Sequence, residues 1–274
     1  MSISREGFDY VRKLVHSHSG VVLEPGKEYL VEARLLPLAQ TEGLASVQTF
    51  IERLRASSVG GLQQRVVEAM TTNETFFFRD LRPFEELRRA VLPQVIEKRR
   101  NERRITIWSG ACSSGQEPYT IAMILKEHFP ELLGWSCRLM ASDIAGDVMA
   151  RARVGCYSQL EVSRGLPAHY LVKYFTKQGT EWRLSEDIRR RVEFFEMNLT
   201  KPWPVLPRMD IILMRNVLIY FDLETKRQIF TNLRHQLHSD GWLALGGSET
   251  TLGIDESFER MSGEASGWFR VRKL

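Results

Sequence analysis

Apolar residues recur at helical spacing in the amino-terminal third of the chain. Each of three stripes repeats every three or four residues, which predicts one buried face of an amphipathic helix. The stripes are Phe8, Val11, Leu14 and Val15; Val47, Phe50, Ile51 and Leu54; and Leu62, Val66 and Met70. Turn-forming residues separate them, namely Gly20, Pro25, Gly43, Gly60 and Gly61. The pattern predicts a small helical domain over residues 1–70, then a linker and connecting helix over residues 71–104.

After residue 104 the pattern changes to short apolar runs that alternate with helical segments. The runs cover residues 105–110, 135–143, 191–196 and 209–214. Continuous apolar runs are typical of buried parallel strands, and helices between them are typical of a doubly wound α/β sheet. We therefore expect one α/β domain over residues 105–274. Within it, residues 174–184 indicate a β-hairpin that turns at Gly179.

Residues 105–119 read Ile-Thr-Ile-Trp-Ser-Gly-Ala-Cys-Ser-Ser-Gly-Gln-Glu-Pro-Tyr, which predicts a strand, a turn of small residues and the start of a helix. In a doubly wound sheet, this segment binds a nucleotide-like cofactor. A phosphate-binding loop has lysine directly after its last glycine, whereas here Gln116 and Glu117 follow Gly115. Because a carboxylate at a helix start repels phosphate, the loop favours a cationic adenosine cofactor. S-adenosylmethionine, with its sulfonium and ammonium groups, fits that description.

A second carboxylate, Asp143, stands where the next predicted strand ends, 28 residues after Gly115. An acidic residue at this place in the fold accepts hydrogen bonds from the ribose hydroxyls of a nucleoside. Aspartate is also a favoured helix N-cap, so Asp143 could instead cap a helix over residues 144–154. The two roles are compatible with each other.

The run over residues 209–214 ends in Arg215 and Asn216, and a second apolar stretch leads to Tyr220. A charged residue and an amide at the exit of a buried strand fall at the functional edge of the sheet and need partners. Amine methyltransferases commonly have an Asn/Asp-Pro-Pro-Tyr/Phe tetrapeptide at this point. The arginine in its place suggests an anionic acceptor; the alternative is that Arg215 pairs with Asp210 or Asp222.

Four blocks of the sequence resemble the CheR family of chemotaxis receptor methyltransferases. They are Met-Thr-Thr-Asn-Glu-Thr-Phe-Phe-Phe-Arg at 70–79, Trp-Ser-Gly-Ala-Cys-Ser-Ser-Gly-Gln-Glu-Pro-Tyr at 108–119, Ala-Ser-Asp-Ile at 141–144 and Arg-Asn-Val-Leu-Ile-Tyr-Phe at 215–221. The resemblance implies a Rossmann-like α/β methyltransferase domain with a small N-terminal helical domain and a small antiparallel β subdomain inserted at about 155–196. It also implies S-adenosylmethionine-dependent O-methylation of glutamate side chains on receptor signalling helices, with S-adenosylhomocysteine as product.

The resemblance also assigns site residues. The implied cofactor contacts are Asn73, Thr75, Arg79, Glu117, Asp143, Asn198, Leu199, Arg215 and Asn216. Tyr220 and Arg79 are the candidates for orienting the acceptor carboxylate and the methyl group. The three phenylalanines at 76–78 either close over the adenosine or form core between domains, and they could do both.

The implied partners are the acidic methylation helices of chemoreceptors. Basic residues of the helical domain could steer them in, although a plain solvated surface explains the same residues equally well. These residues are Arg12, Lys13, Arg53, Arg55 and Arg65. Some family members dock a receptor tail peptide through a longer glycine-rich loop. Because the turn at Gly179 is short, we expect no tight binding of a receptor carboxyl-terminal pentapeptide.

Composition changes this picture little. The net charge is +4, and no apolar run reaches 18 residues, so we expect a cytoplasmic protein without membrane insertion. The basic run at 98–104 lacks interleaved aromatics and is expected to close a helix, which argues against nucleic acid. The histidine spacing predicts no metal site. The three cysteines are expected to be free thiols, and Cys112 is expected to fill the loop rather than act as a nucleophile.

Two other functions remain open from the sequence. A methyltransferase acting on RNA or on a small acid would share the cofactor blocks, but it would not need the 70–79 block or the helical domain. A binding-only regulator would keep the fold and lose turnover.

Overall fold

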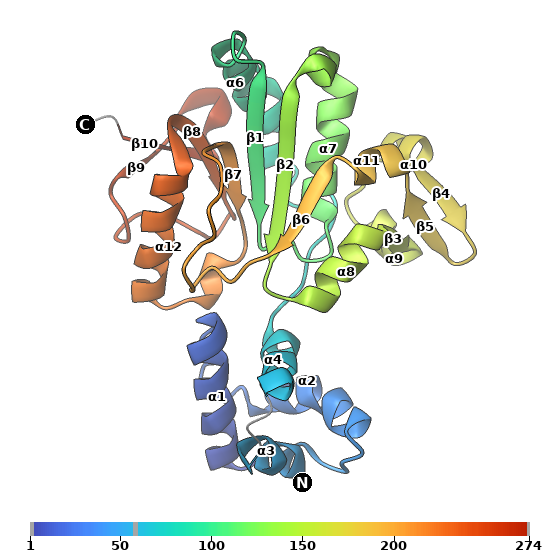
Figure 1. The fold of residues 1–274 in the computed structure, drawn as a ribbon, viewed down its shortest axis with the longest axis vertical. Coiled ribbons are helices and arrows are strands. Elements are labelled where there is room, and N and C mark those ends of the chain that lie inside the picture. The colour runs from blue at the N-terminus through green and yellow to red at the C-terminus, as the bar shows by residue number, and fades with distance from the viewer. Residues whose placement is uncertain (1–2, 57–59, 273–274) are drawn as a thin grey trace.

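The computed structural model describes residues 3–56 and 60–272 of the chain. Figure 1 shows a bundle of short helices below a twisted sheet with helices on both sides, and a small second sheet beside it. The first two strands of the large sheet, β1 and β2, end on the side that faces the helical bundle. A ligand at the carboxyl ends of these strands would therefore lie between the two domains.

The helical domain contains the three predicted helices and one more. Its elements are α1 (Arg5–Ser19), α2 (Glu28–Thr41), α3 (Val47–Ala56) and α4 (Gly60–Met70). The three apolar stripes are buried in one common core, so the prediction for them is confirmed. The pattern missed α2, which buries only Val31, Leu35 and Ala39 and contains Pro37. A stripe with one buried residue per turn and an internal proline lacks the usual helical signal.

The large sheet has the strand order β6-β2-β1-β7-β8-β10-β9. The strands are β1 (Arg104–Gly110), β2 (Ser136–Asp143), β6 (Val192–Glu196), β7 (Met209–Met214), β8 (Leu237–Leu245), β9 (Phe258–Arg260) and β10 (Trp268–Val271). The first five strands in that order pair in parallel, and β10 and β9 add an antiparallel edge. The chain moves outward in opposite directions from β1, through β2 on one side and β7 on the other. That reversal of strand order is where doubly wound sheets bind ligands.

Helices cover the large sheet and connect it to the helical domain. They are α5 (Arg82–Glu86), the π-helical turn η1 (Leu87–Val91), α6 (Leu92–Lys98), α7 (Gln116–His128), α8 (Gly146–Val154) and α12 (Leu223–Gln236), with 3₁₀ turns η2 (Pro130–Gly134), η3 (Leu218–Tyr220) and η4 (Gly263–Ala265). The predicted helices after Gly115 and Asp143 are confirmed to within about two residues. The basic run lies at the end of a helix just before β1, as predicted, because Lys98 ends α6 and Arg99 is its C-cap. Arg99 also donates hydrogen bonds to Asp210 (Nε–Oδ1, 2.6 Å) and Asp240 (Nη2–Oδ1, 2.7 Å).

The small sheet has the order β3-β5-β4 and is antiparallel. Its strands are β3 (Cys156–Ser158), β4 (Phe175–Gln178) and β5 (Glu181–Leu184), with the short helices α9 (Gln159–Ser163), α10 (Ala168–Tyr174) and α11 (Glu186–Arg189) around them. The hairpin predicted at Gly179, whose φ is +61°, is confirmed.

The linker after α4 is fastened to the small sheet by aromatic packing. The Phe77 ring lies edge-on to Tyr157 and Phe175, with centroids 5.0 and 5.5 Å away. Gly165 lets the linker backbone pass, because a Cβ there would lie 2.2 Å from the carbonyl oxygen of Phe77. The linker therefore has a fixed path beside the large sheet.

The end of α1 contacts the loops at the carboxyl ends of β6 and β7. The backbone N–H of Val22 donates to the carbonyl of Tyr220 (2.9 Å), and Asn198 Nδ2 donates to the carbonyl of His18 (2.5 Å). His16 Nε2 lies 2.8 Å from Asp222 Oδ2. These contacts bring the helical domain against the loop that carries Tyr220.

Replacing Asp222 by alanine should destabilise the protein by about 1 kcal/mol, because Asp222 Oδ1 caps α12 by accepting from the N–H of Thr225 (2.8 Å). That N–H, and then His16, lowers the pKa of Asp222 from 3.8 to about 2. The ionised carboxylate therefore stabilises the fold above pH 3.8, and this contribution is lost as the pH falls toward 2. Urea unfolding at pH 7 and pH 3 measures both effects. Glu224→Ala, at an exposed position in the same helical turn, is the control, and equal losses in the two variants would contradict the capping role.

Candidate active site

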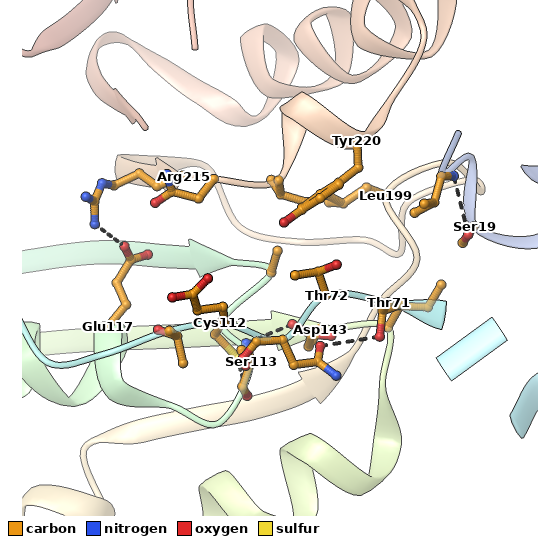
Figure 2. A pocket seen from close by; sticks show the side chains of 18 of the residues that line it. Ser19, Thr71, Thr72, Cys112, Ser113, Glu117, Asp143, Leu199, Arg215 and Tyr220 are labelled. Atoms are coloured by element: carbon orange, nitrogen blue, oxygen red, sulfur yellow. Dashed lines mark hydrogen bonds and ion pairs between the residues drawn. The ribbon is translucent and has the colours of Figure 1, made fainter. Parts of the chain in front are cut away.

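A pocket of about 890 Å³, counting its open mouth, lies between the helical domain and the carboxyl ends of β1, β2 and β7. Segments far apart in the chain line it (Figure 2). It brings together every site residue that the sequence suggested: Asn73, Thr75, Arg79, Glu117, Asp143, Asn198, Leu199, Arg215, Asn216 and Tyr220. The size is ordinary for a small-molecule or cofactor site.

The loop after β1 forms the floor of the pocket with a strained, compact backbone. Ala111 and Ser113 have φ values of +53° and +50°, and Gly115 has +91°. A Cβ at Gly115 would lie 3.0 Å from the Cβ of Ala152, so both conformation and space require glycine. Burial, with Asp143 and Glu117 nearby, raises the pKa of the Cys112 thiol well above its usual value. A neutral, buried thiol fits the predicted filling role and not a nucleophile.

Asp143 ends β2 inside the pocket and is almost fully buried. Its Oδ2 accepts from the N–H of Ser113 (2.8 Å) and its Oδ1 from the N–H of Ala145 (3.0 Å). Burial raises its pKa above the usual value, against the lowering effect of these donors. The N-cap of α8 is Ala145, without a side-chain cap, so the interpretation of Asp143 as a helix cap is wrong. Its remaining acceptor capacity is available to a ligand.

Glu117 and Arg215 form a buried ion pair across the pocket (Figure 2). Arg215 Nη1 donates to Glu117 Oε2 (2.7 Å), and the hydroxyl of Ser109 donates to Oε1 (2.8 Å). Arg215 Nη2 donates to Asp80 Oδ2 (2.8 Å) and to the carbonyl of Arg79 (2.9 Å). The pair therefore connects the start of α7, the end of β7 and the linker.

This network corrects two expectations about Arg215. Its partners are neither Asp210, which bonds to Arg99, nor Asp222, which caps α12. Its side chain is 1% exposed and two carboxylates neutralise it, so it does not offer a free cation to an anionic acceptor. Sequence reasoning could not find these partners because they lie 98 and 135 positions away.

The amide residues of the pocket are held by neighbouring backbone. Asn198 Oδ1 accepts from the N–H of Thr200 (3.0 Å), which fixes the turn that also places Leu199. The hydroxyl of Ser113 donates to the carbonyl of Asn73 (2.8 Å), so the linker rests on the loop after β1. Asn216 has a φ of +59° at the exit of β7.

Arg79 reaches the pocket from the linker. Its Nη1 donates to the carbonyl of Glu74 (2.6 Å), and its guanidinium lies 5.5 Å from the centroid of Phe76. Phe77 and Phe78 are buried in the core of the α/β domain and do not line the pocket. The idea that the three rings close over the adenosine is therefore wrong, and the core alternative holds for two of them.

The pocket also contains residues that the sequence did not single out. These include Ser19, Val21, Thr71, Thr72, Glu74, Ala111, Ser113, Ile144, Met197, Val217 and Phe221. Thr71 and Thr72 stand inside the 70–79 block, which could have indicated them. Ser19 and Val21 come from the helical domain, where no local pattern marks a site.

Residues 3–56 and 60–272 contain neither a membrane-spanning helix nor a cluster of metal ligands. None of the helices there is both long enough and apolar enough to span a bilayer. No group of three or more His, Cys, Asp or Glu side chains in that part of the chain is placed to hold a metal ion.

The doubly wound sheet, the carboxylates at its switch point and the covering helical domain define a methyltransferase that uses S-adenosylmethionine. The family model described as "CheR methyltransferase, SAM binding domain" matches residues 73–266, and "CheR methyltransferase, all-alpha domain" matches residues 6–71. The chain belongs to the CheR methyltransferase family.

Curated relatives match almost end to end. "Chemotaxis protein methyltransferase Cher2" of Pseudomonas putida is 37% identical over 263 residues, covering 94% of this chain and 95% of that protein. "Chemotaxis protein methyltransferase 1" of Pseudomonas aeruginosa is 38% identical with the same coverage. "Chemotaxis protein methyltransferase" of Borreliella burgdorferi is 33% identical, covering 92% of this chain and 91% of that protein.

Proposed function

We propose that this methyltransferase esterifies glutamate side chains on the cytoplasmic signalling helices of chemoreceptors. The products are glutamate methyl esters and S-adenosylhomocysteine. The observation that carries the proposal is that the carboxylates of Glu117 and Asp143 line the same pocket as Arg79 and Tyr220. The names of the relatives, all chemotaxis protein methyltransferases, support the same substrate class.

The polar groups of the pocket fit S-adenosylmethionine. Asp143 retains acceptor capacity for ribose hydroxyls. Glu117 and Asp80 together outweigh the charge of Arg215, so this cluster has a net negative charge that suits a cationic ligand. The charge of Arg215 is taken up by Glu117 and Asp80, but its Nε is buried without an acceptor in the described part of the chain, which leaves one hydrogen-bond donor for an oxygen atom of the cofactor. When bound, the cofactor supplies an activated methyl group on a sulfonium. Asn73, Thr75, Asn198, Leu199 and Asn216 complete the proposed contacts.

The reaction depends on aligning the acceptor carboxylate with the methyl group more than on proton transfer. A glutamate with a pKa near 4.3 is already ionised at neutral pH, so the chain needs no general base. Held geometry can supply roughly 7 to 11 kcal/mol of the barrier reduction. Figure 2 shows the hydroxyl of Tyr220 directed into the pocket, where we propose that it donates to the acceptor carboxylate. Arg79, which lines the same pocket, is the second proposed orienting group.

The basic residues of the helical domain are partly neutralised. Arg53 and Arg65 both pair with Glu42, at 3.6 and 2.8 Å. The Arg55 guanidinium lies 5.7 Å from the centroid of the Tyr10 ring. Such exposed pairs are weak, so these residues still contribute positive potential toward an acidic helix.

Reversing Arg53 and Arg55 together to Glu should raise KM for receptor fragments on the order of tenfold at low salt, because the change repels an acidic partner. The difference should shrink toward 0.5 M salt as the charges are screened. Steady-state kinetics at two salt concentrations measures it. The matched control reverses Arg89 and Arg100, two exposed residues near α6. If both double reversals raise KM equally, the basic residues of the helical domain have no specific role in substrate recognition.

We propose no tight docking of a receptor tail on the small sheet. Strand β4 exposes Thr176, Lys177 and Gln178 at an edge, but the two-residue turn at Gly179 leaves no loop to build side-chain pockets. Titration of a tail pentapeptide should show binding weaker than micromolar.

Assays on different acceptors separate the proposal from its rivals. Labelled S-adenosylmethionine is offered with receptor-containing membranes, with RNA and with small carboxylic acids. Transfer to the receptor membranes alone supports the proposal. Transfer to RNA or to small acids would replace it, and cofactor binding without transfer to any acceptor would indicate a binding-only regulator.

A further inference from the structure

The loops that follow the neighbouring strands β7 and β8 lie side by side at the edge of the pocket. Strands β7 and β8 pair in parallel, and their last residues, Met214 and Leu245, are in register. The chain after β7 carries the pocket residues Asn216 and Tyr220, whereas the chain after β8 turns through Gly246 to Glu249. Glu249 does not line the pocket.

The carboxylate of Glu249 collects the backbone donors of the loop after β7. Its Oε2 accepts from the N–H of Asn216 (2.8 Å). Its Oε1 accepts from the N–H groups of Val217 (2.9 Å) and Leu218 (2.7 Å), with a longer contact to Ile219 (3.4 Å). One side chain thus satisfies successive donors at the start of the 3₁₀ turn that leads to Tyr220, where no preceding helical carbonyl is available.

Gly246 keeps the two loops in direct contact. A Cβ on Gly246 would lie 2.7 Å from Asn216 Nδ2 and 2.9 Å from the Asn216 backbone nitrogen. The N–H of Gly246 also donates to Glu249 Oε2 (2.6 Å). The loop after β8 is therefore shaped to hold the loop after β7, and the clamp has no room for a larger residue.

We propose that Glu249 is a positioning residue for the acceptor side of the active site. It acts through the backbone of residues 216–219 and so sets where Asn216 and Tyr220 stand in the pocket. This inference rests on the proposed function, because it assumes that Tyr220 orients the acceptor. Of the proposed cofactor contacts, Asn216 alone belongs to residues 216–219. Asp143 ends β2 and Glu117 lies in α7, so cofactor affinity should change far less than turnover.

Glu249→Gln is the test, because it keeps the size of the side chain but turns one acceptor into a donor that faces backbone N–H groups. We expect kcat on receptor fragments to fall on the order of tenfold or more, with the Kd for S-adenosylhomocysteine changed less than threefold. Amide hydrogen exchange should rise in peptides covering 216–219. Gly246→Ala should reproduce this pattern by displacing the same loop. Glu256→Gln, an exposed residue after the same strand, is the control and should behave like the parent protein.

Unchanged kcat and unchanged exchange in Glu249→Gln would overturn the inference. A parallel loss of kcat, cofactor affinity and thermal stability would also overturn it, because general destabilisation explains that result. Failure of the proposed function has a different signature: the parent protein itself forms no ester on receptor fragments, while hydrogen exchange still shows whether Glu249 holds the loop.

Discussion

Replacing Asp143 by alanine is expected to weaken the binding of S-adenosylmethionine and S-adenosylhomocysteine together, by roughly tenfold to a hundredfold. Asp143 is buried at the end of β2, with acceptor capacity left after bonding Ser113 and Ala145. A ribose contact is the same in cofactor and product, so the two losses should match. Isothermal calorimetry with each ligand measures them.

The raised pKa of Asp143 adds a pH dependence to the same experiment. Because burial raises this pKa, the carboxylate takes up its proton at a higher pH than an exposed aspartate does. The protonated form has less acceptor capacity, so affinity for both ligands should begin to fall at a higher pH than ordinary aspartate titration predicts. Asp147→Ala, exposed in the first turn of α8, is the control. Unchanged affinity in Asp143→Ala, with only lower thermal stability, would leave Asp143 a purely structural residue.

Replacing Tyr220 by phenylalanine is expected to lower kcat on receptor fragments by roughly a hundredfold, with less than a threefold change in cofactor affinity. The phenol is directed into the pocket, and its backbone is held by Val22 and by the turn that Glu249 caps. The ring and its packing survive the change, so the loss isolates the hydroxyl. Single-turnover kinetics and calorimetry separate the two quantities.

Tyr170→Phe serves as the matched control for Tyr220→Phe. It removes a hydroxyl that lies 3.2 Å from His128 Nε2, outside the pocket. Its turnover should equal that of the parent protein. Equal losses of turnover and of cofactor affinity in Tyr220→Phe would assign the hydroxyl to cofactor binding instead of the acceptor.

Local patterns in the sequence predicted residues that line the pocket beside β1 and β2. A strand, a small-residue loop and a helix are contiguous in the chain, so Gly115, Glu117 and Asp143 could be placed by their spacing alone. The apolar stripes of α1, α3 and α4 also predicted these helices, because each stripe belongs to one continuous helix. Helix α2 was not predicted, because its buried stripe is narrow and Pro37 lies within it.

Contacts between segments that are far apart in the chain could not be predicted from local sequence patterns. The partners of Arg215 and the clamp made by Glu249 depend on which strands become neighbours in the sheet. The sequence suggested that Arg215 binds an anionic methyl acceptor, because it shows the positive charge of Arg215 but not the carboxylates that pair with it in the fold. The 76–78 phenylalanines were ambiguous for a similar reason, since apolar rings serve equally as lid or core until the fold shows what surrounds them.

The most direct test of the proposed function is the chemical identity of the transferred methyl group. The protein is incubated with methyl-labelled S-adenosylmethionine and receptor signalling fragments, and the modified fragments are treated with alkali. A glutamate methyl ester releases volatile labelled methanol, and replacing the modified glutamates by alanine abolishes the label. Label that resists alkali, or label that persists after those glutamates are replaced, would contradict glutamate esterification.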